Sequence, residues 1–237
     1  MTAGNPVIRR KAHIPSVTFP YRHLDGVHAA GREGTSMTGA AGEREKEMKK
    51  EVEILSSLER NKGNLDEVTQ GYANILVKIL CGKELHICCA ESCTAGLVAA
   101  AIASVPGASS VMDKSFVTYS ERAKAELVDV SMRTIKEHGV VSMQVAKEMA
   151  NGAFRHADRG VGIGITGYAG PSGDPVGKVC FGIRAAEKGD DIEKDVYVGT
   201  SYVFTGDRNT IREKAAVAAL ALAILAVDST MDKELPL

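Results

Sequence analysis

The spacing of hydrophobic residues changes along the chain and divides it into three parts. Residues 1–42 have no sustained period of 2 or 3.6, so they offer no continuous apolar face for burial, and we expect a disordered tail. In residues 43–62, apolar side chains recur every three or four positions among many charged ones. This spacing predicts an N-terminal amphipathic helix whose Glu and Lys residues face water. Residues 65–230 carry the pattern of one folded domain.

The domain opens with a helical pattern and then changes to short apolar runs. Residues 65–81 keep a spacing of three or four, and Gly82 is the expected end of that helix. Residues 85–90 are short and largely apolar, which predicts a buried strand. The alanine-rich segment 94–104 is expected to form the helix that follows.

Strands and helices continue to alternate in the middle of the chain. Residues 116–119 predict a second strand, and another helix should begin near Ser120. Residues 142–157 have helical spacing, with Ser142 as the expected N-cap. In residues 161–166, glycine alternates with β-branched residues, which predicts a strand that another backbone approaches closely.

Two neighbouring strands and a long helix complete the pattern. Residues 178–185 and 195–204 predict strands separated by a polar turn at 187–191, and an alanine-rich helix should occupy 207–227. Alternating strands and helices followed by a hairpin favour an α/β fold, a three-layer α/β/α sandwich with a mixed sheet.

Composition limits the classes of partner. The 237 residues are 44% hydrophobic and 25% charged, with a formal net charge of −1, which is typical of a globular protein without an overall positive field. We therefore expect neither nucleic acid nor an anionic membrane as the partner. A small, locally recognised ligand is expected instead. The longest apolar runs, near 215–227, are shorter than the roughly 20 residues that span a bilayer.

The cysteines indicate reduced thiols in a cytoplasmic protein. They are odd in number, lie in apolar surroundings and have no paired spacing typical of zinc sites. The five are Cys81, Cys88, Cys89, Cys93 and Cys180.

The tail is more basic than acidic. It holds five basic and two acidic residues, a balance that allows an organelle-targeting interpretation. We favour a dispensable tail or a misassigned start codon.

The heptapeptide AESCTAG, residues 90–96, lies between a predicted strand and a predicted helix. Ser92 is therefore expected at the carboxyl edge of the sheet, where α/β proteins gather their ligands. The free N–H groups of the helix N-terminus could hold an oxyanion there, or the Ser92 hydroxyl could cap them, and the local pattern favours capping. Cys93 is intrinsically the better nucleophile, but a small residue at an apolar junction is more typical of packing.

A nucleophilic serine needs a base, and no histidine is suitably placed, since His86 lies in a predicted strand and His138 in a predicted loop. Lysine is the other known partner of serine, and Lys124 lies where a strand passes into a helix. To be an efficient base at pH 7 it needs a pKa roughly 3 units below its reference value of about 10.4, which burial can supply. An exposed helical lysine is the simpler interpretation, and pairing with Ser120 one turn away is a further alternative.

A glycine-rich segment, TGYAGP at 166–171, follows a predicted strand. Its backbone N–H groups could form a nest for phosphate or carboxylate, although a plain tight turn fits equally well. Arg208, near the start of the last helix, could reinforce an anion site or form a surface ion pair.

Taken together, these motifs strongly resemble the CinA C-terminal family, whose members act as nicotinamide mononucleotide deamidases. The similarity covers about residues 65–228, and we expect the stand-alone form, without the larger N-terminal domain that many members carry. The motifs, in order, are AESCTAG, VTYS with AK at 117–124, HGVVS at 138–142, TGYAGP with PVG at 175–177, and GDR at 206–208.

The resemblance implies hydrolysis of the carboxamide of nicotinamide mononucleotide to nicotinate mononucleotide and ammonia, without metal or organic cofactor. It implies that Ser92 is the nucleophile and Lys124 its general base, with Tyr119 lining the site. It further implies a homo-oligomer in the cytoplasm; the same reaction serves pyridine nucleotide salvage and repair. The implied substrate contacts are Thr94, Thr166, Gly167, Gly170 and, for the 5′-phosphate, Arg208.

Three departures from the family pattern bear on ligand fit. Ala95 stands where two consecutive glycines usually begin, the loop at 172–174 is shorter than is common, and Lys178 replaces a small polar residue. A non-catalytic nucleotide-binding or regulatory module is therefore the alternative function. A third hypothesis makes Cys93 the nucleophile.

Overall fold

The structure is a computed structural model that describes residues 37–60, 64–158, 160–185 and 195–228, with only the helical backbone for 37–48. The strands are β1 (Ile87–Glu91), β2 (Phe116–Val117), β3 (Val161–Gly167), β4 (Lys178–Ala185) and β5 (Val196–Val203). The helices are α1 (Met37–Arg60), α2 (Leu65–Lys83), α3 (Leu97–Ala103), α4 (Glu121–Val128), α5 (Met132–His138), α6 (Met143–His156) and α7 (Arg208–Val227), with a short 3₁₀ turn at Ala108–Ser110.

The five strands form one mixed sheet in the order β2-β1-β3-β4-β5. β1 runs parallel to both β2 and β3, whereas β4 is antiparallel to its neighbours β3 and β5. The carboxyl ends of the three parallel strands consequently meet at one edge, where α/β folds gather their functional loops.

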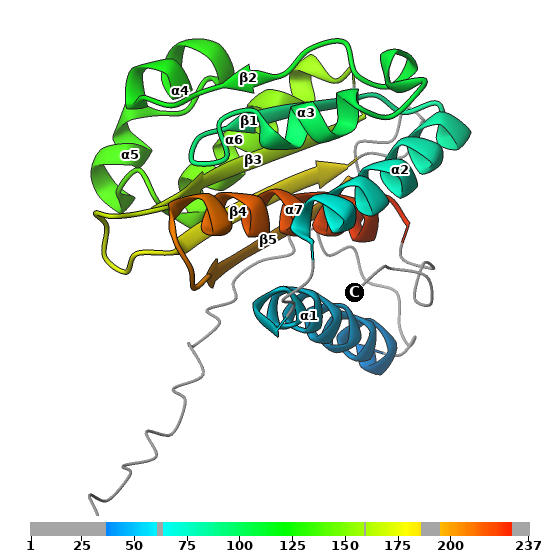
Figure 1. The fold of residues 1–237 in the computed structure, drawn as a ribbon, viewed down its shortest axis with the longest axis horizontal. Helices are drawn as coiled ribbons and strands as arrows, with labels where there is room; N and C mark the ends of the chain where they lie inside the picture. Colours follow the sequence, from blue (N-terminus) through cyan, green and yellow to red (C-terminus); the bar gives the residue numbers. More distant parts are fainter. Residues whose placement is uncertain (1–36, 61–63, 159, 186–194, 229–237) are drawn as a thin grey trace, which may run out of the picture.

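Helices cover both faces of this sheet (Figure 1). On one face α2, α3 and α7 pack together with the C-terminal half of α1, over strand residues that include Ile87 and Cys89. On the other face α4, α5 and α6 pack over Cys88 and Ala90. Successive side chains of β1 thus enter opposite layers, as the period of a strand requires. The three-layer α/β/α sandwich with a mixed sheet is confirmed.

The glycines of β3 allow α6 to lie directly on the sheet. A Cβ on Gly162 would lie 2.2 Å from the Ala150 carbonyl oxygen, and one on Gly164 would lie 2.3 Å from that of Ala146. Real Cβ atoms essentially never come this close to backbone oxygen. The close backbone approach expected from the glycine pattern is therefore present, and the partner is α6.

Several element boundaries differ from the sequence expectation. Helix α2 does not end at Gly82; it continues to Lys83, and Glu84 takes the left-handed capping conformation with φ 53°. Helix α3 begins at Leu97 instead of residue 94, because residues 92–96 form a turn. Helix α5 was not expected, and His138 ends it instead of lying in a loop.

The first helix begins earlier than expected. Helix α1 begins at Met37, so residues 37–42 are helical although the spacing assigned them to the tail. Its buried residues Ile54, Leu55 and Leu58 repeat at helical spacing and join the main core. The expected disorder of the remaining tail and the polar turn at 187–191 lie outside the described residues.

A methyl group added to β3 should separate the sheet from α6. We expect Gly164→Ala to lower the free energy of unfolding by about 3 kcal/mol, the upper end of the usual cost of overpacking, since the clash is with backbone atoms. Gly82→Ala is the matched control, because a Cβ there meets no atom within 4 Å and lies in a helix. Urea denaturation of both variants measures the difference; equal stabilities would contradict the close packing.

Candidate active site

Ser92 and Lys124 come together at the carboxyl edge of the parallel strands. Ser92 directly follows β1, whereas Lys124 lies on α4, which follows β2. The Lys124 Nζ lies 2.9 Å from the Ser92 Oγ, and both side chains are buried. The sequence analysis left an exposed helical Lys124 as the simpler interpretation; that interpretation is wrong.

The surroundings of Lys124 increase the fraction of its neutral form. Its Nζ lies 2.8 Å from the Thr118 carbonyl oxygen and 3.4 Å from that of Tyr119. Burial lowers the pKa of Lys124 to about 8, although the neighbouring Cys93 and Glu121 oppose this shift. The three oxygen neighbours match the three donors of the ammonium; the neutral amine keeps two donors for the carbonyls and turns its lone pair to the Ser92 hydroxyl. The 2.9 Å contact is therefore short enough for the neutral amine to accept the proton of Ser92.

Glu91 caps the helix that follows Ser92. Its carboxylate, only 1% exposed, accepts hydrogen bonds from the N–H groups of Gly96, Val98 and Ala99 at 2.9 to 3.2 Å. Glu91, and not the Ser92 hydroxyl, therefore caps α3, and these three N–H groups are not available to an oxyanion. The capping by Glu91 leaves the Ser92 hydroxyl to Lys124. Sequence reasoning missed Glu91 because it placed the helix N-terminus too early.

Ala95 lies in the left-handed region, with φ 51°, within the turn that carries Ser92. This conformation costs an L-residue about 1–2 kcal/mol, whereas glycine adopts it freely. The methyl group is exposed, so it crowds no buried neighbour. Alanine at this position therefore costs backbone strain and causes no steric clash with a buried side chain.

Cys93 is buried beside the site and is a poor nucleophile. Burial raises the pKa of its thiol to about 12, which leaves almost no thiolate at neutral pH. The backbone around it is held by Arg212 of α7, which donates to the carbonyls of Cys93 and Thr94 at 3.0 and 3.1 Å. Sequence reasoning missed Arg212, although its position four residues after Arg208 places both on one helix face.

Tyr119 and Arg208 meet at the exposed mouth of the site. The Arg208 guanidinium donates to the Tyr119 hydroxyl at 2.8 Å and also to the Gly170 carbonyl. Both side chains are exposed, so the guanidinium is accessible to an anion from solvent. Three segments that are far apart in the sequence thus converge where Arg208 begins α7.

The other expected substrate contacts lie deeper. The Thr166 hydroxyl donates to the Val140 carbonyl at 2.8 Å, and Gly167 pairs with Val179 in the sheet. The Thr94 hydroxyl is buried and has no hydrogen-bond partner among the described residues. Geometry brings these residues to the same edge as Ser92 but shows no exposed hydroxyl at Thr94 or Thr166.

The alternative partner for Lys124 is occupied. The Ser120 hydroxyl accepts a hydrogen bond from the Ala123 N–H and caps α4.

The short loop that contains residues 172–174 is closed by a hydrogen bond from the Gly177 N–H to the Tyr168 carbonyl at 2.7 Å.

The described residues offer neither a membrane-spanning helix nor a cluster of metal ligands. None of these helices combines the length and apolar character needed to cross a bilayer. In the same part of the chain, no three His, Cys, Asp or Glu side chains lie close enough to hold a metal ion.

Known proteins share both sequence and fold with this chain. The family model for the CinA C-terminal domain matches residues 69–227. A relative from Enterobacter agglomerans, named nicotinamide-nucleotide amidohydrolase PncC, is 43% identical over 143 residues, which are 58% of this chain and 82% of that protein. A relative from Caldicellulosiruptor saccharolyticus, whose name refers to competence and damage, is 41% identical over 155 residues, or 64% of this chain and 36% of that protein. The chain spans about a third of the length of such longer relatives.

Solved structures agree with these sequence matches. A CinA superfamily protein from Escherichia coli superposes with a TM-score of 0.61 at 30% identity, covering 71% of this chain and 94% of that one. A competence/damage inducible protein from Agrobacterium tumefaciens gives a TM-score of 0.61 at 30% identity, covering 68% and 96%.

Replacing Ala95 by glycine should stabilise the protein. We expect Ala95→Gly to raise the free energy of unfolding by about 0.5–1 kcal/mol, because the steric relief exceeds the added entropy of the unfolded chain. Ala100→Gly, at an exposed site inside α3, should lower it by about 1 kcal/mol. Urea denaturation measures both, and a loss of stability in Ala95→Gly would contradict the strain at this turn.

Proposed function

This chain belongs to the CinA C-terminal domain family, and from that premise we propose that it hydrolyses the carboxamide of nicotinamide mononucleotide. The products are nicotinate mononucleotide and ammonia. The observation that carries the proposal is the 2.9 Å contact between the Ser92 Oγ and the buried Lys124 Nζ. The name of the Enterobacter agglomerans relative supports the choice of substrate.

Ser92 is the nucleophile and Lys124 the general base in this mechanism. Neutral Lys124 takes the Ser92 hydroxyl proton as the oxygen attacks the amide carbon, and a C–O bond forms. The resulting ammonium returns the proton to the amide nitrogen as the C–N bond breaks, so ammonia leaves. Water, deprotonated by Lys124, then attacks the acyl-enzyme and releases nicotinate mononucleotide and free Ser92.

The N–H groups that remain next to the nucleophile are those of Cys93 and Thr94. Both N–H groups contact the Cys93 thiol, a weak acceptor, whereas the Glu91 carboxylate binds the N–H groups of Gly96, Val98 and Ala99. We assign the Cys93 and Thr94 N–H groups to the oxyanion of the tetrahedral intermediate, a stronger acceptor than the thiol. Arg212 supports this role because it fixes the carbonyls of the same two residues. The cationic pyridinium ring of the substrate makes the carbonyl more electrophilic.

Arg208 binds the 5′-phosphate in this proposal. Its guanidinium is exposed and held by Tyr119 and Gly170, so it can donate to a phosphate without first being ordered. Thr94, Thr166 and Gly167 line the inner part of the site through backbone atoms and shape.

Removal of either reacting group should abolish turnover. We expect Ser92→Ala and Lys124→Met to lower kcat by at least about 10³-fold, because each removes a group that acts only as part of the pair. Cys93→Ser should keep kcat within about threefold, since the thiol takes no part. Ammonia released from nicotinamide mononucleotide is the measurement.

Matched controls separate chemistry from folding. Lys136→Met makes the same change at an exposed lysine of α5 and should leave kcat unchanged. Turnover that survives in Ser92→Ala would exclude this nucleophile. Nucleotide binding without any ammonia from the wild type would favour the non-catalytic binding module.

The pH profile should report the ionisation of Lys124. With a pKa of about 8, roughly one molecule in ten carries the neutral amine at pH 7. Because the neutral form is the base, kcat/KM should rise about tenfold per unit below pH 8 and level off above it. Initial rates at subsaturating substrate from pH 6 to 9.5 check this; a profile that falls across pH 8 would mean that the ammonium form is active.

A further inference from the structure

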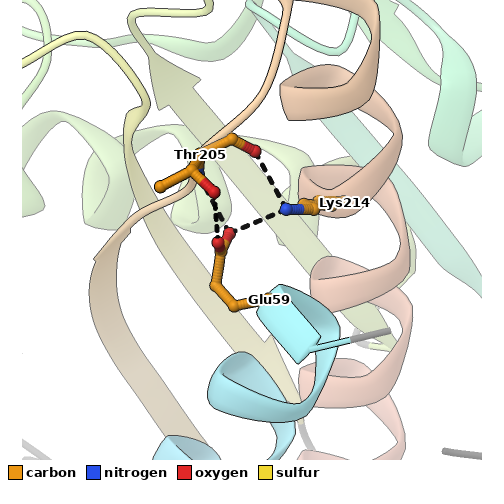
Figure 2. A network of polar contacts seen from close by, with 3 residues as sticks. All are labelled: Glu59, Thr205 and Lys214. Carbon is orange, nitrogen blue, oxygen red and sulfur yellow. Dashed lines mark hydrogen bonds and ion pairs between the residues drawn. The ribbon is translucent and has the colours of Figure 1, made fainter. Parts of the chain in front are cut away.

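One carboxylate of helix α1 contacts the segment that precedes Arg208. Glu59, near the end of α1, lies outside residues 69–227, the range that matches the family. Its carboxylate accepts hydrogen bonds from the Thr205 N–H at 3.0 Å and the Thr205 hydroxyl at 2.6 Å. It also pairs with the Lys214 ammonium at 3.0 Å (Figure 2).

Glu59, Thr205 and Lys214 fill most of one another's hydrogen-bonding capacity. Lys214 is 6% exposed, and its ammonium donates both to Glu59 and to the Thr205 carbonyl at 2.9 Å. Burial alone would raise the pKa of Glu59, but hydrogen bonds from Thr205 and the charge of Lys214 outweigh it and hold the pKa below its usual value. The N–H, hydroxyl and carbonyl of Thr205 are therefore all engaged, which fixes its orientation.

Thr205 stands three residues before Arg208, in the segment that joins β5 to α7. The preceding residue, Phe204, donates its N–H to the Gly177 carbonyl at 3.0 Å. Asp207 caps α7 by accepting from the Thr210 N–H at 2.8 Å. Only Gly206 and Asp207 separate Thr205 from Arg208, and this short segment is hydrogen-bonded on both sides.

The attachment of α1 does not depend on Glu59 alone. Ile54, Leu55 and Leu58 are 0 to 3% exposed and belong to the main core, so the helix stays docked when the carboxylate is removed. The polar contact can therefore be changed separately from the apolar one.

We propose that Glu59 is a positioning residue for the phosphate-binding Arg208: by fixing Thr205, α1 sets the affinity of the site for the substrate's phosphate. This inference rests on the proposed function and adds to it an element outside the family domain. Glu59 touches neither the substrate nor Ser92; it acts through the β5–α7 segment.

The experiment compares a substrate that has the phosphate with one that lacks it. For Glu59→Ala we expect KM for nicotinamide mononucleotide to rise about tenfold with kcat changed less than about twofold, because only ground-state binding is lost. The kinetic constants for nicotinamide riboside, which has no phosphate, should stay within about twofold of the wild type. Equal losses with both substrates, or no loss with either, overturn the proposal.

Three further variants separate positioning from charge and folding. Glu59→Gln keeps an acceptor for Thr205 and should restore much of the affinity. The double variant Glu59→Ala/Lys214→Met leaves no unpaired buried charge, so a KM that stays raised supports positioning, whereas a return to the wild-type KM overturns it. Glu53→Ala removes the same charge from an exposed site on the same helix and should change neither constant.

A binding measurement distinguishes this inference from the proposed reaction. Calorimetric titration with inorganic phosphate needs no turnover. If the wild type binds phosphate, Arg208→Ala abolishes binding and Glu59→Ala weakens it about tenfold, the inference stands even when no ammonia is released. If Glu59→Ala binds phosphate as tightly as the wild type, or the wild type does not bind it, the inference fails.

Discussion

The candidate site depends on one buried amine. Lys124 Nζ contacts three uncharged oxygens, from Ser92, Thr118 and Tyr119, which lie at the ends of β1 and β2. Because these partners carry no charge, they do little to hold a proton on the amine, and burial lowers its pKa to about 8. An exposed lysine at the same distance from Ser92 would keep its usual pKa and act poorly as a base. The packing of α4 against the sheet edge therefore decides the chemistry.

A division of tasks between neighbouring side chains keeps Ser92 free for Lys124. The hydroxyl of a serine that precedes a helix usually accepts a hydrogen bond from one of the unpaired N–H groups of the first turn. Here the Glu91 carboxylate satisfies three of those groups from inside the fold. Arg212 then holds the two carbonyls that follow Ser92. The turn is ordered by charged groups on both sides of the nucleophile, and it tolerates the strained Ala95 within it.

Helix α1 lies outside the residues that match the family and adds contacts to the domain. Its apolar stripe joins the core on the α7 side, and its last turn places a carboxylate beside a buried cation. Removing one member of a buried, hydrogen-bonded pair leaves an uncompensated charge, so Glu59 and Lys214 depend on each other. Their contact lies beside the segment that leads to Arg208, which is the route by which we propose that an element outside the family range influences the site.

Local patterns in the sequence determined the fold class and nearly every element. Hydrophobic periods reflect contacts between residues two to four positions apart, and these identified the strands and all helices but α5; the residue types at the helix starts added the cap at Ser142. The ordered motifs pointed to Ser92 and Lys124 but left the exposure of the lysine open. Only the tertiary structure decided which side chains meet. Ser92 and Lys124 are 32 positions apart in the sequence, Arg212 and Cys93 are 119 apart, and Glu59 and Lys214 are 155 apart. Such contacts, and the burial that shifts the pKa of Lys124, arise from packing between layers, which no local period encodes.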